Sequence, residues 1–217
     1  MKKAVGLTIP TTLEELLDPA SCALIIYDVQ DGIVRQIANG KEIVGRVRQV
    51  LNAARKAGVR TFFTRHMSLP KRLMGVAQFR TAMAWQKTDN PDAVVPWFLR
   101  DSPGFGIASE IEPTADEAVF DKITMSAFEG TPLAIALRDC GIRSIVLCGI
   151  ALEIGIEPTA RHAVDLGIVP VIVSDACGHG SAEGAKRTIE QLTFLGDTEF
   201  TDLATIMRAW ASPPTSE

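Results

Sequence analysis

The sequence has no excess of positive charge, because 22 lysines and arginines stand against 26 aspartates and glutamates, which gives a net charge of −4 at pH 7. A field of this sign repels phosphate, so we expect neither nucleic acid nor an anionic membrane as a partner. The sequence also lacks any run of about 18 apolar residues, and the start MKKAVGLTIP reaches Pro10 before any long apolar core. We therefore expect a soluble cytoplasmic protein that is not exported.

Several signatures of common sites are missing as well. The four cysteines form no C-x-x-C pair of the zinc or redox type, and the three histidines form no H-x-x-x-H pair. The glycine patterns of dinucleotide-binding and P-loop proteins do not occur, and neither does the G-x-S-x-G of serine hydrolases. We interpret the cysteines as reduced thiols: Cys22, Cys140, Cys148 and Cys177.

What the sequence has instead is a series of short apolar runs that alternate with stretches of helical periodicity. This alternation is typical of a mostly parallel sheet with helices on both faces, connected by right-handed crossovers. At 217 residues, one domain buries roughly 70% of the surface of its unfolded chain. We predict an α/β fold over residues 1–217, a single Rossmann-like three-layer sandwich. The predicted strands are 22–27, 59–64, 118–120, 144–148 and 168–173, and the predicted helices are 41–56, 131–140, 156–166 and 181–195.

Two segments depart from this alternation. Residues 65–117 are too long for a plain connection and hold two tryptophans, Trp85 and Trp97, and the loop DSPGFG at 101–106. We predict that this segment is a lid or an oligomer contact. The end of the chain, 211–217, is predicted to be a flexible tail.

Two charged residues follow predicted strands, where an open parallel sheet binds its ligands. Asp28 ends the run 22–27, a setting that tunes the pKa of a carboxyl group, although an aspartate there also serves as a helix or turn cap. Lys122 follows the run 118–120, and a buried ammonium needs a counter-charge, for which Asp28 is the candidate. The alternative is a surface lysine paired with Asp121 or Glu129.

A glycine-bounded loop, 149–155, links the run 144–148 to a helix with Pro158 in its first turn. Proline costs no hydrogen bond there. We therefore expect the amides near Gly155 to point free into the crevice, where they favour an anion or a developing oxyanion. The alternative is that Gly155 serves only a tight turn.

Three separated motifs occur in one order along the chain: LIIYDVQ at 24–30, DKITMSAFEGTPL at 121–133 and VLCGIA at 146–151, followed by PTA at 158–160 and VSDA at 173–176. Together they resemble the isochorismatase-like hydrolase (cysteine hydrolase) superfamily over roughly residues 20 to 200. Most members carry a catalytic Asp after the first strand, a Lys before S-x-F and a Cys that opens the late helix. The resemblance maps these positions onto Asp28, Lys122 and Gly155.

The glycine decides what the resemblance implies, because Gly155 has no side chain to form a covalent intermediate. The isochorismatase branch also lacks that cysteine and hydrolyses a vinyl ether without one. The resemblance further implies six parallel strands, a cis peptide between Ile150 and Ala151, an oxyanion pocket from the amides of Ala151 and Gly155, and a homodimer or homotetramer. Nicotinamidase-like relatives hold a metal after the second strand, where this chain has a single histidine, His66. We therefore predict no catalytic metal and no cofactor.

We predict a hydrolase of a small organic molecule, either a vinyl ether or the C–N bond of an amide or imide. Asp28 would handle a proton, Lys122 would hold Asp28 and polarise the substrate, and water would attack directly in the room left by Gly155. The alternatives are a non-catalytic binding member that lost the nucleophile, and an amidohydrolase that uses Cys148 or Cys177. Arginine suits a substrate carboxylate. The candidate substrate-binding residues are Gln30, Arg65, Trp85, Trp97, Phe128 and Glu153.

Overall fold

The computed structural model, which describes residues 1–211, is built on a six-stranded sheet in the order β5-β4-β3-β6-β7-β8. Every neighbouring pair in it is parallel. The predicted α/β sandwich is therefore confirmed. The strands are β3 (Cys22–Tyr27), β4 (Arg60–His66), β5 (Ala118–Lys122), β6 (Ser144–Ile150), β7 (Val169–Gly178) and β8 (Glu199–Thr201).

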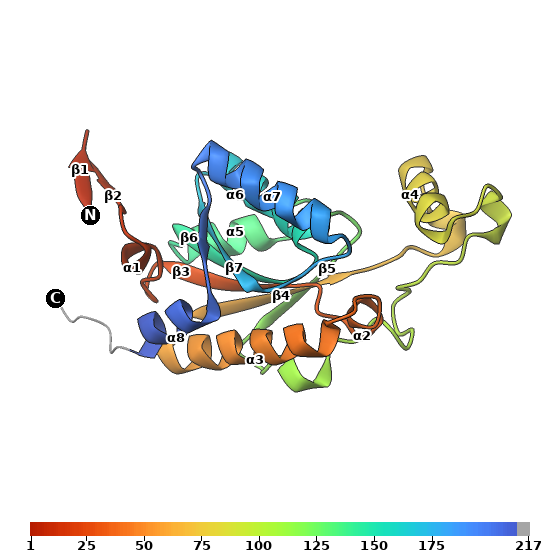
Figure 1. Cartoon of the computed structure of the whole chain (residues 1–217), viewed down its shortest axis with the longest axis horizontal. Coiled ribbons are helices and arrows are strands. Elements are labelled where there is room, and N and C mark those ends of the chain that lie inside the picture. The colour runs from red at the N-terminus through yellow and green to blue at the C-terminus, as the bar shows by residue number, and fades with distance from the viewer. Residues whose placement is uncertain (212–217) are drawn as a thin grey trace.

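Helices cover both faces of this sheet (Figure 1). On one face lie α3 (Gly40–Ala57) and α8 (Leu203–Ala211), and on the other lie α5 (Leu133–Asp139), α6 (Glu157–Asp165) and α7 (Ala182–Leu195). Each layer has its own apolar core, because successive side chains of a strand point to opposite faces. In β3, Leu24 and Ile26 belong to the core under α3, whereas Ala23 and Ile25 belong to the opposite one.

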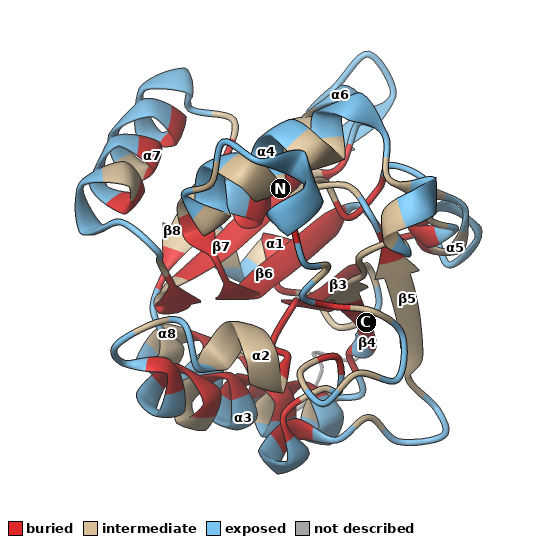
Figure 2. Ribbon diagram, turned by 90° about the vertical axis from the view of Figure 1, so that its right-hand side faces the viewer, coloured by how far each residue is buried: buried red, intermediate tan, exposed pale blue. Residues whose placement is uncertain are grey.

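The helix α3 illustrates how the sequence specifies these layers. Its apolar residues recur every three or four positions, so they form one stripe that packs on the sheet. The stripe consists of Ile43, Val44, Val47, Val50, Leu51 and Ala54, all buried, and Figure 2 shows the buried side of α3 turned toward the strands. The helix ends as predicted at Gly58, whose φ of +73° is the left-handed conformation that glycine adopts at little cost.

The predicted insertion leaves the sheet at the end of β4 and returns at β5. It contains α4 (Val76–Gln86) and three single turns of 3₁₀-helix, Lys71–Leu73, Pro91–Ala93 and Ser109–Ile111. Figure 1 shows α4 standing beyond the end of the sheet, and none of its residues is buried. The remaining elements are short: β1 (Lys2–Ala4) and β2 (Leu7–Ile9), which pair with each other, α1 (Leu13–Leu16) and α2 (Asp31–Val34).

Some predicted boundaries were wrong. The helix predicted over 131–140 begins at Leu133, and β7 continues five residues past the predicted end. The predicted tail 211–217 begins with Ala211, which ends α8; residues 212–217 lie outside the described part of the chain. Within residues 1–211, no helix is long and apolar enough to cross a membrane.

Candidate active site

The centre of the site is a buried ion pair between the ends of β3 and β5. Lys122 reaches Asp28 with its Nζ 2.6 Å from Oδ2, and its side chain is fully buried. Nζ also donates to the Tyr27 hydroxyl at 2.8 Å and to the Thr124 carbonyl at 3.1 Å, so all three ammonium protons have acceptors. Thr64 donates its hydroxyl to the other carboxylate oxygen at 2.6 Å. Burial lowers the pKa of Lys122, and the Asp28 charge opposes that shift.

Asp28 has an unusual backbone that brings two adjacent side chains to the same ammonium. Neighbouring residues of a strand point to opposite faces, yet Tyr27 and Asp28 both contact Lys122. The change of direction occurs at Asp28, whose φ is +48°. A non-glycine residue in this region is strained, and such strain clusters at functional sites.

Tyr27 closely approaches Gly155. A Cβ placed on Gly155 would lie 2.0 Å from the Tyr27 hydroxyl oxygen and 2.2 Å from Cζ. The hydroxyl donates to the Met125 carbonyl, and burial, followed by the Asp28 charge, raises the pKa of Tyr27 well above its ordinary value of 10. The expectation that Gly155 leaves room for water was wrong, because a neutral phenol ring fills that room.

The backbone around Gly155 also differs from the prediction. A π-helical turn, Leu152–Ile156, precedes α6, and within it the Gly155 amide donates to the Ala151 carbonyl at 3.1 Å. The Gly155 amide is therefore not free, because the helical turn starts earlier than Pro158 suggests. The Ile150–Ala151 peptide is cis, as the resemblance implies. Ala151 lines the smaller of the two cavities described below.

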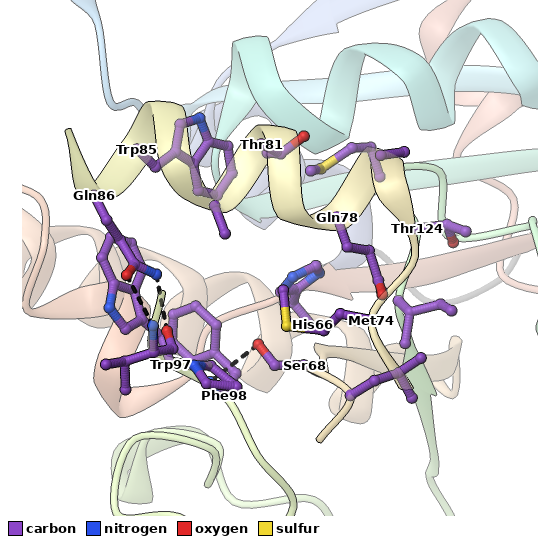
Figure 3. Close-up of a pocket in the computed structure, with 17 residues that line it drawn as sticks. His66, Ser68, Met74, Gln78, Thr81, Trp85, Gln86, Trp97, Phe98 and Thr124 are labelled. Carbon is purple, nitrogen blue, oxygen red and sulfur yellow. Dashed lines mark hydrogen bonds between the residues drawn. The ribbon is translucent and has the colours of Figure 1, made fainter. Parts of the chain in front are cut away.

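Two adjoining cavities open at this end of the sheet. The smaller, about 150 Å³, has Tyr27 and Asp28 in its wall together with Ala151. The larger, about 300 Å³, lies between α4 and the segment 95–98 (Figure 3). Both share four wall residues: His66, Trp85, Phe98 and Met125.

Of the candidate substrate-binding residues, Trp85 lines both cavities and Trp97 lines the larger one. Arg65 lines neither, because its guanidinium pairs with Asp121 at 2.7 Å and lies 4.3 Å above the Phe105 ring. The Arg65 side chain thus already has a carboxylate partner inside the protein.

Gln30, Phe128 and Glu153 also lie outside both walls. The fully buried Gln30 amide exchanges hydrogen bonds with the backbone of His66 and Phe105. Phe128 packs in the core 5.4 Å from the His162 ring. Glu153 accepts the amides of 180 and 181 at 2.8 and 2.7 Å. All three are held by contacts within the protein.

Sequence reasoning did not find most of the wall residues, among them Tyr27, Phe98 and Met125. Tyr27 had one available signal, a polar hydroxyl directly before the strand-end aspartate. His66 was considered only as a metal ligand. Burial has the largest effect on the pKa of the His66 imidazole and lowers it below the ordinary value of 6.5.

Cys148, Cys177 and Asp175 line neither of the two cavities. Cys148 and Cys177 are buried outside both walls, and burial raises the pKa of Cys177 to about 12 and that of Cys148 well above 9. Asp175 lies within β7 and accepts the Leu203 amide at 2.9 Å. Over residues 1–211, no three His, Cys, Asp or Glu side chains gather in a group that could hold a metal.

Comparisons with known proteins agree with this geometry. The isochorismatase domain model matches residues 22–206. The uncharacterized isochorismatase family protein YecD of Escherichia coli O157:H7 is 33% identical over 81% of this chain and 89% of its own length. The ureidoacrylate amidohydrolase RutB of Methylobacterium radiotolerans is 24% identical over 84% of this chain and 77% of its own.

Among solved structures, an isochorismatase family protein from Burkholderia thailandensis is 28% identical, with a TM-score of 0.73 over 89% of this chain and 97% of that one. The parallel sheet, the matched residues and these relatives agree. The chain belongs to the isochorismatase family and is a hydrolase of that family.

Proposed function

We propose that this hydrolase cleaves a small organic molecule by direct attack of water, and that Gly155 stands where most family members carry the nucleophilic cysteine. The observation that carries the proposal is the fit of Tyr27 against Gly155. No side chain at 155 fits beside that ring, because even a Cβ would lie 2.0 Å from the hydroxyl oxygen. A thiol at this position is therefore excluded sterically as well as by the sequence.

Asp28 is the group suited to activate water. It lines the smaller cavity, and its two carboxylate oxygens accept hydrogen bonds from Lys122 and Thr64. In our scheme Asp28 takes a proton from water while the water oxygen bonds to the substrate carbon. It then returns that proton to the leaving nitrogen of an amide or imide as the C–N bond breaks. On a vinyl ether the order is reversed: a protonated Asp28 gives its proton to the alkene carbon, water attacks the resulting oxocarbenium carbon and gives a proton back to Asp28, and the hemiketal then breaks down. The Ala151 amide is placed to donate to the developing oxyanion.

We assign Lys122 a positioning role and no contact with substrate. Its three N–H donors are used inside the protein, and it is absent from both cavity walls. Lys122 therefore has no free N–H with which to polarise the substrate, contrary to the role expected from the sequence. The ammonium instead fixes the carboxylate and the phenol relative to each other.

The test is turnover of a panel of amides, imides and vinyl ethers, followed by Asp28→Asn assayed on the best substrate. General base assistance contributes about 10²–10⁴-fold, so turnover should fall by that factor. Asp175→Asn is the matched control, because that carboxylate lies outside both cavity walls and the asparagine oxygen can still accept the Leu203 amide. Circular dichroism verifies that both variants are folded. Turnover in Asp28→Asn within about twofold of wild type would remove the carboxylate from the mechanism.

Two other functions remain distinguishable by experiment. A binding protein without catalysis would show affinity for such molecules but no turnover. An amidohydrolase that uses Cys148 or Cys177 would lose activity when that cysteine is changed to alanine. The burial and raised pKa of both thiols argue against this second function, because the thiolate is the nucleophilic form.

A further inference from the structure

We infer that the substrate is an uncharged molecule with a flat apolar group, such as an aromatic ring, which occupies the cavity between α4 and the segment 95–98. This inference rests on the proposed function, since it names the substrate class of the same site. It comes from an independent observation, the charge and shape of the cavity walls.

The walls carry almost no net charge. Within the described residues, the wall of the larger cavity contains no aspartate, glutamate, lysine or arginine, and the wall of the smaller one contains only Asp28. The Asp28 charge is matched by Lys122 at 2.6 Å. Burying an ion without a counter-charge is costly, so the cavities favour a neutral ligand.

Three cations at this end of the sheet, Arg65, Arg100 and Lys122, line neither cavity and are held by other groups. Arg65 and Arg100 both pair with Asp121, at 2.7 and 3.0 Å. Lys122 is buried with all its donors used. Burial lowers the pKa of His66, so its ring is neutral near pH 7. A substrate carboxylate would therefore find no cationic partner in the described walls of the two cavities and would meet the Asp28 carboxylate.

The shape of the larger cavity favours a flat apolar group. Figure 3 shows Trp85 on α4 opposite Trp97 and Phe98, with space between the two sides. The tryptophans are 46% and 39% exposed, so large apolar faces remain uncovered. A ligand with an aromatic ring gains by covering them.

Few polar groups in the wall of the larger cavity are free to bind a polar ligand. Gln86 exchanges hydrogen bonds with both backbone groups of Val95, and the Ser68 hydroxyl accepts the Phe98 amide. The wall shared with the smaller cavity, which includes His66 and Phe98, leads from this apolar space to Asp28. A ring held beside α4 would thus present an attached amide or ether toward the carboxylate.

Equilibrium binding of four small probes tests the inference separately from catalysis. Benzamide, benzoate, benzylamine and acetamide are titrated into the full chain, with tryptophan fluorescence and thermal melting as readouts. We expect benzamide to bind at least tenfold more tightly than benzoate or benzylamine, which carry a charge, and than acetamide, which lacks the ring. Tighter binding of benzoate or benzylamine, or equal binding of acetamide, would overturn the inference.

Three variants locate the binding. Trp85→Ala should weaken the binding of benzamide at least fivefold. The control is Phe194→Ala, which removes a ring that is 86% exposed and lines neither cavity, and it should leave benzamide binding unchanged. Thr81 is an exposed wall residue on α4, so Thr81→Lys adds an ammonium to the cavity with little risk to the fold. This variant should bind benzoate at least tenfold more tightly than wild type. Unchanged benzoate affinity would show that this cavity does not hold the ligand and would overturn the inference.

The outcomes separate the two proposals. Preferential benzamide binding in the complete absence of hydrolysis across the panel would support the ligand class and refute the proposed hydrolysis. Turnover that depends on Asp28 but prefers anionic substrates would support the hydrolysis and overturn the ligand class.

Discussion

Gly155→Ala should destabilise the protein, although alanine is normally the better helix former. The added Cβ would lie 2.0 Å from the Tyr27 hydroxyl oxygen, 2.2 Å from Cζ and 2.4 Å from Cε1, whereas apolar atoms pack at about 3.5–4.0 Å. Tyr27 is 2% exposed and its hydroxyl accepts a hydrogen bond from Lys122, so the ring has little freedom to move away. Overpacking of this kind costs about 1–3 kcal/mol.

A matched control isolates the steric cost. Gly45 lies inside α3, and a Cβ there would meet nothing within 4 Å. Gly45→Ala should therefore stabilise the protein by about 0.5–1 kcal/mol, the ordinary helix preference for alanine. The assay is urea unfolding of both variants followed by circular dichroism. For a protein of this size, each kcal/mol also shifts the melting temperature by roughly 2–4 °C.

The partner of the clash is identified by a double-mutant cycle. Tyr27→Val alone leaves a cavity and should cost about 2–4 kcal/mol. The added methyl group fills part of that space, so Tyr27→Val/Gly155→Ala should be more stable than the sum of the single effects by about 1–3 kcal/mol. Additive effects, or a Gly155→Ala variant as stable as wild type, would refute the steric reasoning and with it the main support for a site without a thiol.

Two further predictions concern the protonation of His66 and the reactivity of the cysteines. Burial lowers the folded-state pKa of His66 below the unfolded value of 6.5, so the unfolded chain binds a proton first and stability falls as pH drops below about 6.5. Urea unfolding at pH 7.5 and 5.5 should show wild type losing more stability than His66→Gln, and equal losses would contradict this. A thiol reagent should modify one cysteine per native chain, the exposed Cys140, without loss of turnover. Rapid labelling of Cys177, whose pKa is raised to about 12, would contradict its assignment as a buried neutral thiol.

Elements governed by local pattern were predictable from the sequence. The run 22–27 is continuously apolar because β3 is buried on both faces, and α3 was recognisable from its spacing and from Gly58. The pairing of Asp28 with Lys122 was also predictable, because the ends of parallel strands meet at one edge of a sheet and a buried ammonium needs a counter-charge. These inferences depend only on neighbouring residues or on the rules of parallel sheets.

The failures have a different origin, in contacts between distant segments. Nothing near Arg65 in the sequence indicates that Asp121 would occupy its guanidinium. The proline at 158 marks a helix start, but the backbone begins to turn at Leu152, because the Ala151 carbonyl accepts the amides of both 155 and 156. Tyr27 looked like one more apolar strand residue, and its contact with Gly155 spans most of the chain.

The contact between Tyr27 and Gly155 leaves no empty space beside the backbone of residue 155. Each residue fits because of the other: the ring needs a bare backbone at 155, and the space beside that backbone is filled by the ring. A change of Gly155 to cysteine alone would therefore clash, while a change of Tyr27 alone would leave a cavity next to Lys122. Either single change is unfavourable, so Tyr27 and Gly155 stabilise this part of the site as a pair. The Lys122 ammonium contacts a phenol and a carboxylate, and Asp28 is the carboxylate in the described wall of the smaller cavity.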